Sequence, residues 1–202
     1  MQPLGFPNWE ELYRSDTIET LPWYLPSLDP DLESALAQHG ISGGRALDQG
    51  SGPGSQAIAL AERGFIVTAT DISATAVAYA ERKAKARGVA VTFMQDDVLA
   101  TRLTPNFDLI FDRGCFHVIA PERRTDYVGT MYRLLVPSGW LFLKTFSHLQ
   151  PGTEGPHRFA PEDIRQLFAD NERFEVIEIS DTVYQGQLDP FPKALFSVIR
   201  RR

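Results

Sequence analysis

The segment LDQGSGPGSQA, residues 47–57, decides the fold of this chain. A short apolar run reads as a strand over residues 45–49, and a helical pattern begins at residue 55. The turn between them contains three glycines, Gly50, Gly52 and Gly54. Glycine permits unusual backbone angles and leaves room for a ligand close to the main chain. The segment therefore predicts a strand, a ligand-binding turn and a helix in succession.

Helical and strand patterns alternate along the rest of the chain. Helices are predicted over residues 55–64, 74–88, 121–136 and 161–171. Further strands are predicted over residues 65–71, 89–97, 107–113, 140–147, 174–184 and 194–201. This alternation indicates right-handed crossovers, and the last two strands, with no helix between them, predict an antiparallel pair. The expected fold is α/β: a doubly wound, mostly parallel, seven-stranded Rossmann-like sheet with a C-terminal antiparallel hairpin.

Length and composition indicate one domain with an appended segment. The chain has 202 residues, 43% of them hydrophobic, which is enough for one full core. Residues 1–30 contain several prolines and aromatic residues and are predicted to form an N-terminal cap segment. Residues 31–202 are predicted to form the ligand-binding domain.

Cysteine usage and hydropathy predict a cytoplasmic protein. Cys115 is the only cysteine, so no intrachain disulfide can form, which indicates a reducing compartment. No apolar run approaches the roughly 20 residues that span a bilayer. The first residues also lack the basic and apolar regions of a signal peptide.

The charge balance argues against a nucleic-acid partner. The formal net charge is −6, whereas phosphate binding favours a basic face. The four histidines do not have the spacing of metal ligands, so no metal is expected. The expected partner is a small molecule rather than a nucleic acid or a membrane, and the oligomeric state stays open.

Carboxylates follow the first four predicted strands. They are Asp48, Asp71, the pair Asp96 and Asp97, and Asp112. In a parallel sheet of this kind, ligands bind outside the carboxyl ends of the strands, at the point where the strand order reverses. These acidic side chains are therefore predicted to surround the ligand.

The acidic residues narrow the chemistry of that ligand. A dinucleotide turn reads G-x-G-x-x-G/A, whereas the glycines here are spaced G-x-G-x-G. Asp48 would repel two phosphates but would attract an ammonium group. Asp71 lies 17 residues beyond Gly54, close to where such folds place an acid that binds ribose. S-adenosylmethionine, which carries an amino group, a sulfonium, a ribose and an adenine, meets these conditions.

Residues 45–115 resemble the class I S-adenosylmethionine-dependent methyltransferases. The stretches ALDQGSGPG, TATDIS and FMQDDV resemble the first, second and third motifs of that superfamily. The segment FDRGCFHVIAPERRTDYVGTMYRLL is similar to a segment of the thiopurine and thiol methyltransferases, and so are WEELYRSD near the N-terminus and GPHRF. Gln49 and Ser51 replace residues that are commonly leucine and cysteine in the first motif.

The resemblance implies a cofactor site for S-adenosyl-L-methionine. Its implied residues are Asp48, Gly50, Ser51, Gly52, Asp71, Ile72, Asp97, Val98 and Trp23. Asp48 would act on the cofactor's amino group, Asp71 would accept both ribose hydroxyls, and Asp97 would accept the adenine amino group, with the Val98 N–H close to the ring.

Asp112, Arg113 and His117 are the predicted catalytic residues. Arg113 would face the methyl acceptor and favour a thiolate, because its charge persists at any working pH. The alternative for Arg113 is a plain ion pair with Asp112. His117 would take a proton from the acceptor, or it is a structural histidine.

An aromatic group near the N-terminus has two interpretations. Trp9, Tyr13, Trp23 and Tyr24 would form a lid over the cofactor, or would pack the N-terminal segment onto the domain, and both can hold.

The function that these predictions favour is methyl transfer to a small molecule with a thiol or another soft nucleophile. Oxygen and nitrogen acceptors are the close alternatives. From another class, a nicotinamide-dependent oxidoreductase would use the same sheet, but Asp48 and the glycine spacing disfavour it. A cofactor-binding protein without catalysis is the third alternative.

Overall fold

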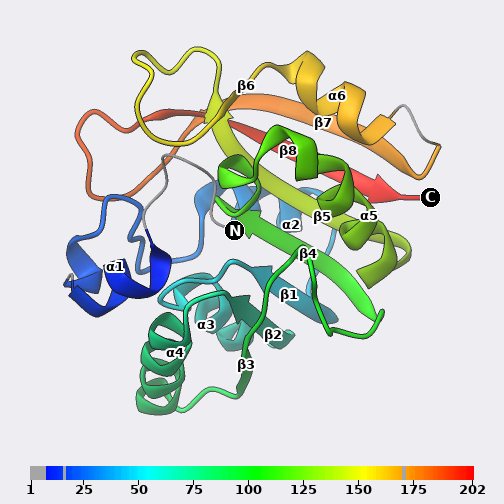
Figure 1. Cartoon of the computed structure of the whole chain (residues 1–202). Helices are drawn as coiled ribbons and strands as arrows, with labels where there is room; N and C mark the ends of the chain where they lie inside the picture. The colour runs from blue at the N-terminus through cyan, green and yellow to red at the C-terminus, as the bar shows by residue number, and fades with distance from the viewer. Residues whose placement is uncertain (1–7, 16, 170–171) are drawn as a thin grey trace.

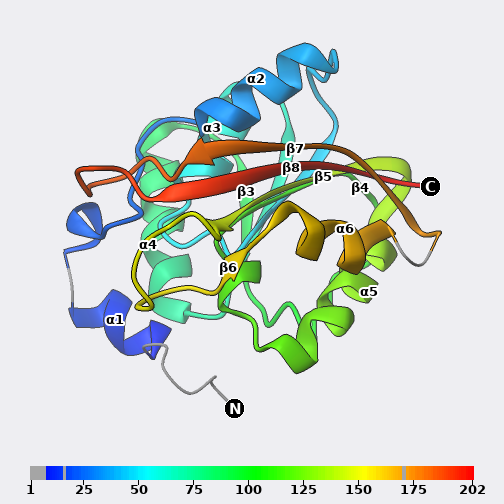
Figure 2. The ribbon, with the colours of Figure 1, turned by 90° about the horizontal axis from the view of Figure 1, so that it is seen from above.

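Helices cover both faces of one sheet in the computed structural model, which describes residues 8–15, 17–169 and 172–202 (Figures 1 and 2). The strands are β1 (Arg45–Gln49), β2 (Ile66–Asp71), β3 (Val91–Gln95), β4 (Phe107–Arg113), β5 (Leu135–Ser147), β6 (Arg158–Phe159), β7 (Phe174–Val183) and β8 (Lys193–Arg201). The α-helices are α1 (Trp9–Ser15), α2 (Pro30–Gln38), α3 (Ser55–Glu62), α4 (Ala74–Arg87), α5 (Arg124–Leu134) and α6 (Pro161–Ala169). Three short 3-10 turns are η1 (Ile18–Thr20), η2 (Phe116–Val118) and η3 (Pro121–Arg123).

The strand order is β3-β2-β1-β4-β5-β8-β7, with β6 paired to β5. Strand β8 runs antiparallel to both β5 and β7, and the other pairs are parallel. The predicted Rossmann-like fold with a C-terminal hairpin is therefore confirmed, and the two-residue strand β6 is an addition to the seven predicted strands.

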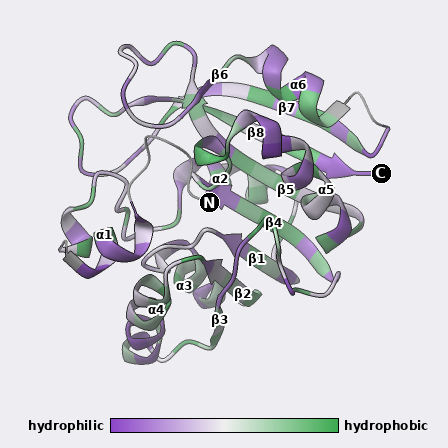
Figure 3. Ribbon diagram, viewed as in Figure 1, coloured by the Kyte–Doolittle hydropathy of each residue, from purple (hydrophilic) through white to green (hydrophobic). Residues whose placement is uncertain are grey.

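The core lies in two layers because neighbouring strand residues point to opposite faces of the sheet. Leu109 and Phe111 belong to a cluster with side chains of α2, α3 and α4. Ile110, between them, belongs to a second cluster with side chains of α5 and α6. Figure 2 shows α2 and α3 on one side of the sheet and α5 and α6 on the other, and Figure 3 shows hydrophobic residues concentrated in the central strands.

The strand order reverses beside β1, which lies between β2 and β4. Asp48 on β1 is in register with Ala69 on β2 and with Phe111 on β4. The carboxyl ends of these three parallel strands consequently meet at one edge of the sheet. This is the place where a doubly wound sheet binds its ligand.

The segment between η3 and β5 differs from the prediction. The helix predicted over residues 121–136 begins as η3, continues as α5 and ends at Leu134. Strand β5 begins at Leu135, before the predicted residue 140, because Leu135 pairs with Phe107 ahead of an irregularity in the β4–β5 register. Ser138, with a φ of 62°, lies between this first pair and the regular part of the strand.

Helix α2 is an addition to the predicted elements. Asp29 caps it, since its side chain accepts a hydrogen bond from the Asp31 N–H at 3.0 Å, and Pro30 occupies the first position. Both are ordinary features of a helix start. The helix places Asp29 inside the molecule, where its side chain is fully buried.

Candidate active site

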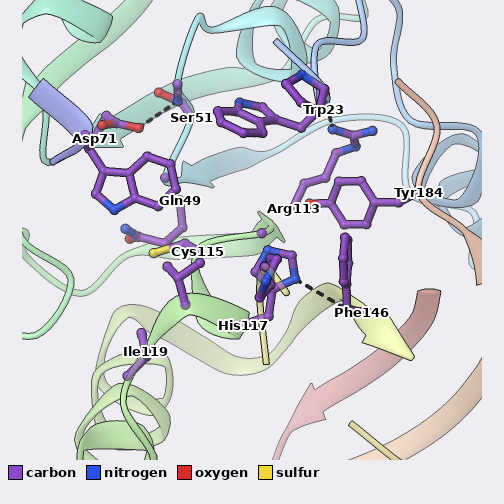
Figure 4. Close-up of a pocket in the computed structure, with 18 of the residues that line it drawn as sticks. Trp23, Gln49, Ser51, Asp71, Arg113, Cys115, His117, Ile119, Phe146 and Tyr184 are labelled. Carbon is purple, nitrogen blue, oxygen red and sulfur yellow. Dashed lines mark hydrogen bonds between the residues drawn. The ribbon is translucent and has the colours of Figure 1, made fainter. Parts of the chain in front are cut away.

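The carboxyl ends of β1, β2 and β4 open into a cavity of about 770 Å³ (Figure 4). Ligand pockets typically measure about 300–1,000 Å³. The glycine turn, part of α1 and residues 22–25 line one part of the cavity. The loop after β5 and the connection between β7 and β8 contribute other parts of the wall. The cavity reaches every predicted cofactor residue and also Arg113 and His117, whereas Asp112 is outside its lining.

The glycine turn follows β1 in a left-handed backbone conformation. Gly52 has a φ of 49°, and its N–H donates to Oδ2 of Asp71 at 2.8 Å. A side chain at this position would be strained and would also meet the hydroxyl of Tyr13 at 2.6 Å. Gly54 has a φ of 73°, and a Cβ there would lie 2.6 Å from the methyl group of Ala80 on α4. The turn therefore depends on glycine for its backbone angles and for close packing.

Asp71 ends β2 inside the cavity wall. Its two oxygens accept hydrogen bonds from the N–H groups of Gly52 and Ser73, at 2.8 and 2.9 Å. Burial raises the pKa of this carboxyl to about 6. Each oxygen keeps further acceptor capacity for hydroxyl groups of a ligand. Ile72, beside it, is half exposed and also lines the cavity.

Asp48 is the more deeply buried acid of the cofactor end. Its Oδ2 accepts a hydrogen bond from the Ala57 N–H, in the first turn of α3, at 2.9 Å. Burial raises its pKa to about 7, and the charges of Asp112 and Asp71 add to this effect. A buried carboxylate with a raised pKa is stabilised by a nearby cation. Asp48 therefore suits a ligand with an ammonium group.

Ser51 adds an unpartnered polar group to the same wall. Its hydroxyl oxygen is buried without a hydrogen-bond partner in the described part of the structure. Buried polar groups are normally paired, so this hydroxyl is available to a bound molecule. Together with Asp48 and Asp71, it fits the amino and ribose groups of S-adenosylmethionine.

Asp97 and Val98 form the third predicted part of the cofactor site. The Asp97 side chain is exposed at the cavity wall and accepts a hydrogen bond from the Leu99 N–H at 2.9 Å. Val98 is buried, and it also lines the cavity. The position suits contacts to an adenine ring, although the Asp97 carboxylate already caps its own turn.

Asp112 lies at the end of β4, as predicted, but its side chain does not line the cavity. Its carboxylate is fully buried and accepts hydrogen bonds from the hydroxyl of Tyr127 at 2.7 Å and from the N–H groups of Gly114, Cys115 and Phe116. These bonds hold the chain between β4 and η2. Because the carboxylate lies behind the cavity wall, we do not retain Asp112 as a catalytic candidate.

Arg113 pairs with Asp29 rather than with Asp112. Its Nε donates to Oδ2 of Asp29 at 2.7 Å, Nη1 donates to the Trp23 carbonyl at 2.9 Å, and Nη2 donates to the Gln185 carbonyl. The guanidinium carbon also lies 4.6 Å from the centre of the Tyr184 ring. Every nitrogen of the guanidinium is therefore engaged by the protein.

Lys144 on β5 extends this buried network. Its ammonium is fully buried, and it donates to Asp29 at 2.8 Å, to Asp31 at 2.6 Å and to the Gln185 side chain at 2.7 Å. Burial opposes the charge of Asp29, but Lys144 and Arg113 hold the pKa of that carboxyl below its usual value. The sequence pattern did not indicate this network, because the side chains that pair in it are 41 to 115 residues apart.

His117 lies on η2 and lines the cavity, apart from Ser51 and Asp71 and next to Phe146 in the view of Figure 4. The ring is buried between Tyr184 and Phe146, with ring centroids 5.7 and 5.2 Å away. Its Nδ1 accepts a hydrogen bond from the Phe146 N–H at 3.2 Å. Burial lowers the pKa of His117 to about 3, and the charge of Arg113 acts in the same direction.

The aromatic residues near the N-terminus lie beside the cofactor end. Trp9 and Trp23 line the cavity and pack edge to face, with ring centroids 5.9 Å apart. Glu10 on α1 accepts hydrogen bonds from the hydroxyls of Ser73 and Thr75 at the start of α4, at 2.7 and 2.6 Å. The segment is thus packed onto the domain and also forms part of the cavity wall.

The described residues offer neither a metal site nor a membrane-spanning helix. They contain no group of three histidine, cysteine, aspartate or glutamate side chains that could hold a metal ion. None of the helices that the structure describes has the length and apolar character needed to cross a membrane.

Comparisons with known proteins point to one family. The methyltransferase-domain family matches residues 46–139. Thiocyanate methyltransferase 1 of Arabidopsis thaliana is 33% identical over 136 residues, which are 66% of this chain and 59% of that protein. The 2-heptyl-1-hydroxyquinolin-4(1H)-one methyltransferase of Mycobacteroides abscessus is 29% identical over 167 residues, covering 79% of this chain and 73% of the relative.

A solved structure supports the same fold. It comes from work on the conversion of a disulfide bond into a thioacetal group during echinomycin biosynthesis, and it superposes with a TM-score of 0.82 at 24% identity. The match covers 96% of this chain and 91% of that one. That likeness concerns the fold alone. Together with the glycine turn and the two buried acids, the family match and the sequence relatives show that the chain belongs to the class I S-adenosylmethionine-dependent methyltransferases.

Proposed function

We propose that this protein transfers a methyl group from S-adenosyl-L-methionine to a small molecule with a thiol or another soft nucleophile. The observation that carries the proposal is the pair of buried carboxylates, Asp48 and Asp71, in the wall of a cavity that His117 also lines. The similarity to thiocyanate methyltransferase 1 supports the soft nucleophile. That match spans 59% of the relative, so the activity of the whole protein is inferred.

The cofactor would lie along the carboxyl ends of β1, β2 and β3. Asp48 would attract its ammonium group, Asp71 would accept its ribose hydroxyls, and Asp97 and Val98 would lie at its adenine. The glycine turn would contact its methionine part through the backbone of residues 50–52. Bound in this way, the cofactor supplies a methyl group that its sulfonium has already activated.

The protein's own contribution would be alignment and exclusion of water. A reacting atom must lie about 3 Å from the methyl group and in line with the bond that breaks. Trp9, Trp23 and Tyr184 would cover this part of the cavity and keep water out. Arg113, held by Asp29, would fix the position of Trp23 through the Trp23 carbonyl.

An oxygen or nitrogen acceptor is the second candidate. The similarity to the methyltransferase of 2-heptyl-1-hydroxyquinolin-4(1H)-one favours a flat, apolar hydroxylated ring as the acceptor. The cavity wall around His117 contains Ile119, Phe146 and Tyr184, which suit such a ring. The net charge of −6 supports a small molecule rather than a nucleic acid as the partner.

We also propose a cap segment on a single domain and a cytoplasmic location for this protein. Residues 1–30 would act as a cap on the domain formed by residues 31–202, with α1 as its described helix; residues 1–7 and 16 of the cap lie outside the described structure. A single cysteine supports a cytoplasmic location.

Calorimetry and product analysis test the proposal together. S-adenosylhomocysteine should bind, and NADH should not. With S-adenosyl-L-methionine, mass spectrometry should then detect a methylated product from a panel of thiols, hydroxylated rings and amines. Binding without any product across the panel would favour a cofactor-binding protein without catalysis. Binding of NADH alone would contradict the proposal.

A further inference from the structure

His117 has one nitrogen that the protein uses and one that faces the cavity. Its Nδ1 accepts the Phe146 N–H at 3.2 Å, where β5 runs past η2. In Figure 4 the ring stands in the cavity wall, with this hydrogen bond on the side of Phe146. The ring cannot easily turn over, because it is buried and packs against Tyr184 and Phe146.

The hydrogen bond fixes the tautomer of the neutral ring. A neutral imidazole carries one N–H, and a nitrogen that accepts a hydrogen bond cannot carry it. Nε2 of His117 must therefore carry the hydrogen. Nε2 lies beside Gly114 and the Tyr184 hydroxyl: a Cβ at position 114 would be 3.0 Å from Nε2 and would also meet that hydroxyl, so glycine leaves room that a side chain would fill.

The groups around the ring oppose a second proton on it. Burial is the largest cause that lowers the pKa of His117 to about 3, and the charges of Arg113 and His157 act in the same direction. Tyr184 and Cys115 are neutral neighbours, because burial raises the pKa of each. Asp112, at the end of β4 and five residues before His117, is a buried acid whose oxygens already accept hydrogen bonds from the loop and from Tyr127.

We propose that His117 binds the methyl acceptor by donating its Nε2–H, and that the acceptor enters the site already deprotonated. The inference rests on the proposed function. The methyl carbon leaves the sulfonium sulfur, which keeps the electron pair of the broken bond, and forms a bond to a lone pair of the acceptor. An anionic acceptor becomes neutral in this step, so no proton has to be taken by the protein. The substrate class is then a thiolate or another soft anion.

Two variants of His117 separate a donor from a packing residue. His117→Gln keeps an amide N–H in place of Nε2–H and an oxygen that can accept the Phe146 N–H. His117→Phe keeps a ring but removes both polar functions. We expect kcat/KM for a thiol acceptor to fall about 10- to 100-fold in His117→Phe and to recover to within about five-fold of the native value in His117→Gln. His39→Gln, on the far side of the sheet at the end of α2, is the matched control and should behave like the native protein.

The pH profile tests the protonation state of the acceptor. We would measure kcat/KM at saturating cofactor with thiols whose pKa values all exceed the value of about 7 for Asp48. In a plot of kcat/KM against pH, the pH below which kcat/KM falls (the acidic limb) should follow the pKa of the thiol, because the thiolate is the form that binds. In His117→Gln the limb should stay at the pKa of the same thiol.

The outcomes distinguish this inference from the proposed function. Calorimetry with S-adenosylhomocysteine should give the same affinity in both His117 variants, which shows that the cofactor site is intact. Equal losses of kcat/KM in His117→Gln and His117→Phe would overturn the donor role. An acidic limb that keeps one pH for every thiol and disappears in His117→Gln would identify His117 as a base instead. Absence of any methylated product from the native protein would contradict the proposed function itself.

Discussion

At the scale of single residues, two carboxyl groups at the cofactor end of the cavity are buried, where their ionised forms are unfavourable. Asp48 and Asp71 are both buried, and burial raises the pKa of each, to about 7 and about 6. A buried carboxylate without a cation destabilises a folded protein when it ionises. Their retention at the cavity wall is therefore explained by a ligand that brings positive charge and hydroxyl groups.

Asp48→Asn should separate stability from binding. Folding raises the pKa of Asp48 from 3.8 to about 7, so the folded state favours the protonated carboxyl. The contribution of Asp48 to the free energy of unfolding is therefore fully present below pH 3.8 and is lost as the pH rises through 7. Asparagine does not ionise and can still accept the Ala57 N–H. At pH 8, without cofactor, we expect the variant to be about 1–3 kcal/mol more stable in urea unfolding.

The same variant should bind S-adenosylmethionine more weakly, because the charge opposite the ammonium group is lost. The stability gain should shrink as the pH falls from 8 towards 4. Asp181→Asn, at an exposed position on β7, is the control and should change neither quantity. Loss of stability at pH 8 in Asp48→Asn would contradict the expected sign.

Asp71→Ala should weaken the binding of S-adenosylhomocysteine by about 1.5–3 kcal/mol, since charge-assisted hydrogen bonds to the ribose are lost. Asp97→Ala should cost about 0.5–1.5 kcal/mol, because Asp97 is exposed and already bonded to the Leu99 N–H. Calorimetry on the two variants, with Asp181→Ala as the control, measures both effects. A larger loss for Asp97→Ala would place the ribose elsewhere.

At the scale of elements, the capped helix α2 and the segment before it are joined to the sheet by buried charges. Asp29 caps α2 and also receives Lys144 from β5 and Arg113 from β4. Two cations and the two carboxylates of Asp29 and Asp31 balance in this network. Such a balance is needed because removal of one partner leaves an uncompensated buried charge.

Lys144→Met should destabilise the fold by about 3–5 kcal/mol, because Asp31 and Asp29 lose a buried ammonium group. Urea unfolding followed by circular dichroism measures the effect. Lys85→Met, at an exposed position on α4, serves as the matched control and should stay within about 0.5 kcal/mol of the native protein. A loss for Lys144→Met as small as that of the control would show that the network contributes little to stability.

At the scale of the whole molecule, ligand binding and stability are coupled through the cavity. Its walls come from both ends of the chain, with Trp9 and Trp23 near one terminus and Tyr184 near the other. A cofactor that contacts these separate segments links them in the folded state only. Binding should consequently raise the unfolding temperature of the molecule.

S-adenosylhomocysteine at about 100 times its Kd should stabilise the protein by about 2.7 kcal/mol. For a chain of this size, that corresponds to a rise of about 5–10 °C in Tm. Scanning calorimetry with and without the ligand measures the rise, and NADH at the same concentration should leave Tm unchanged. A rise with NADH alone would favour the oxidoreductase alternative.

The local sequence determined the elements and the cofactor end of the site. The glycine spacing, the strand-end acids and the alternation of strands and helices are short-range patterns, and a parallel sheet brings the ends of neighbouring strands together. Asp48 and Asp71 were therefore predictable as neighbours in the cavity. Short-range patterns also placed the boundaries of β1 and β4 correctly.

Only the tertiary structure decided which partners the remaining charged and polar groups have. Arg113 pairs with Asp29, 84 residues away, and Lys144 reaches Asp29 across 115 residues. The tautomer of His117 depends on a backbone N–H of β5, 29 residues further along the chain. A charged or polar side chain pairs with a group of suitable chemistry that lies close to it in the folded molecule. Short-range sequence patterns do not specify which distant residues the fold brings close together.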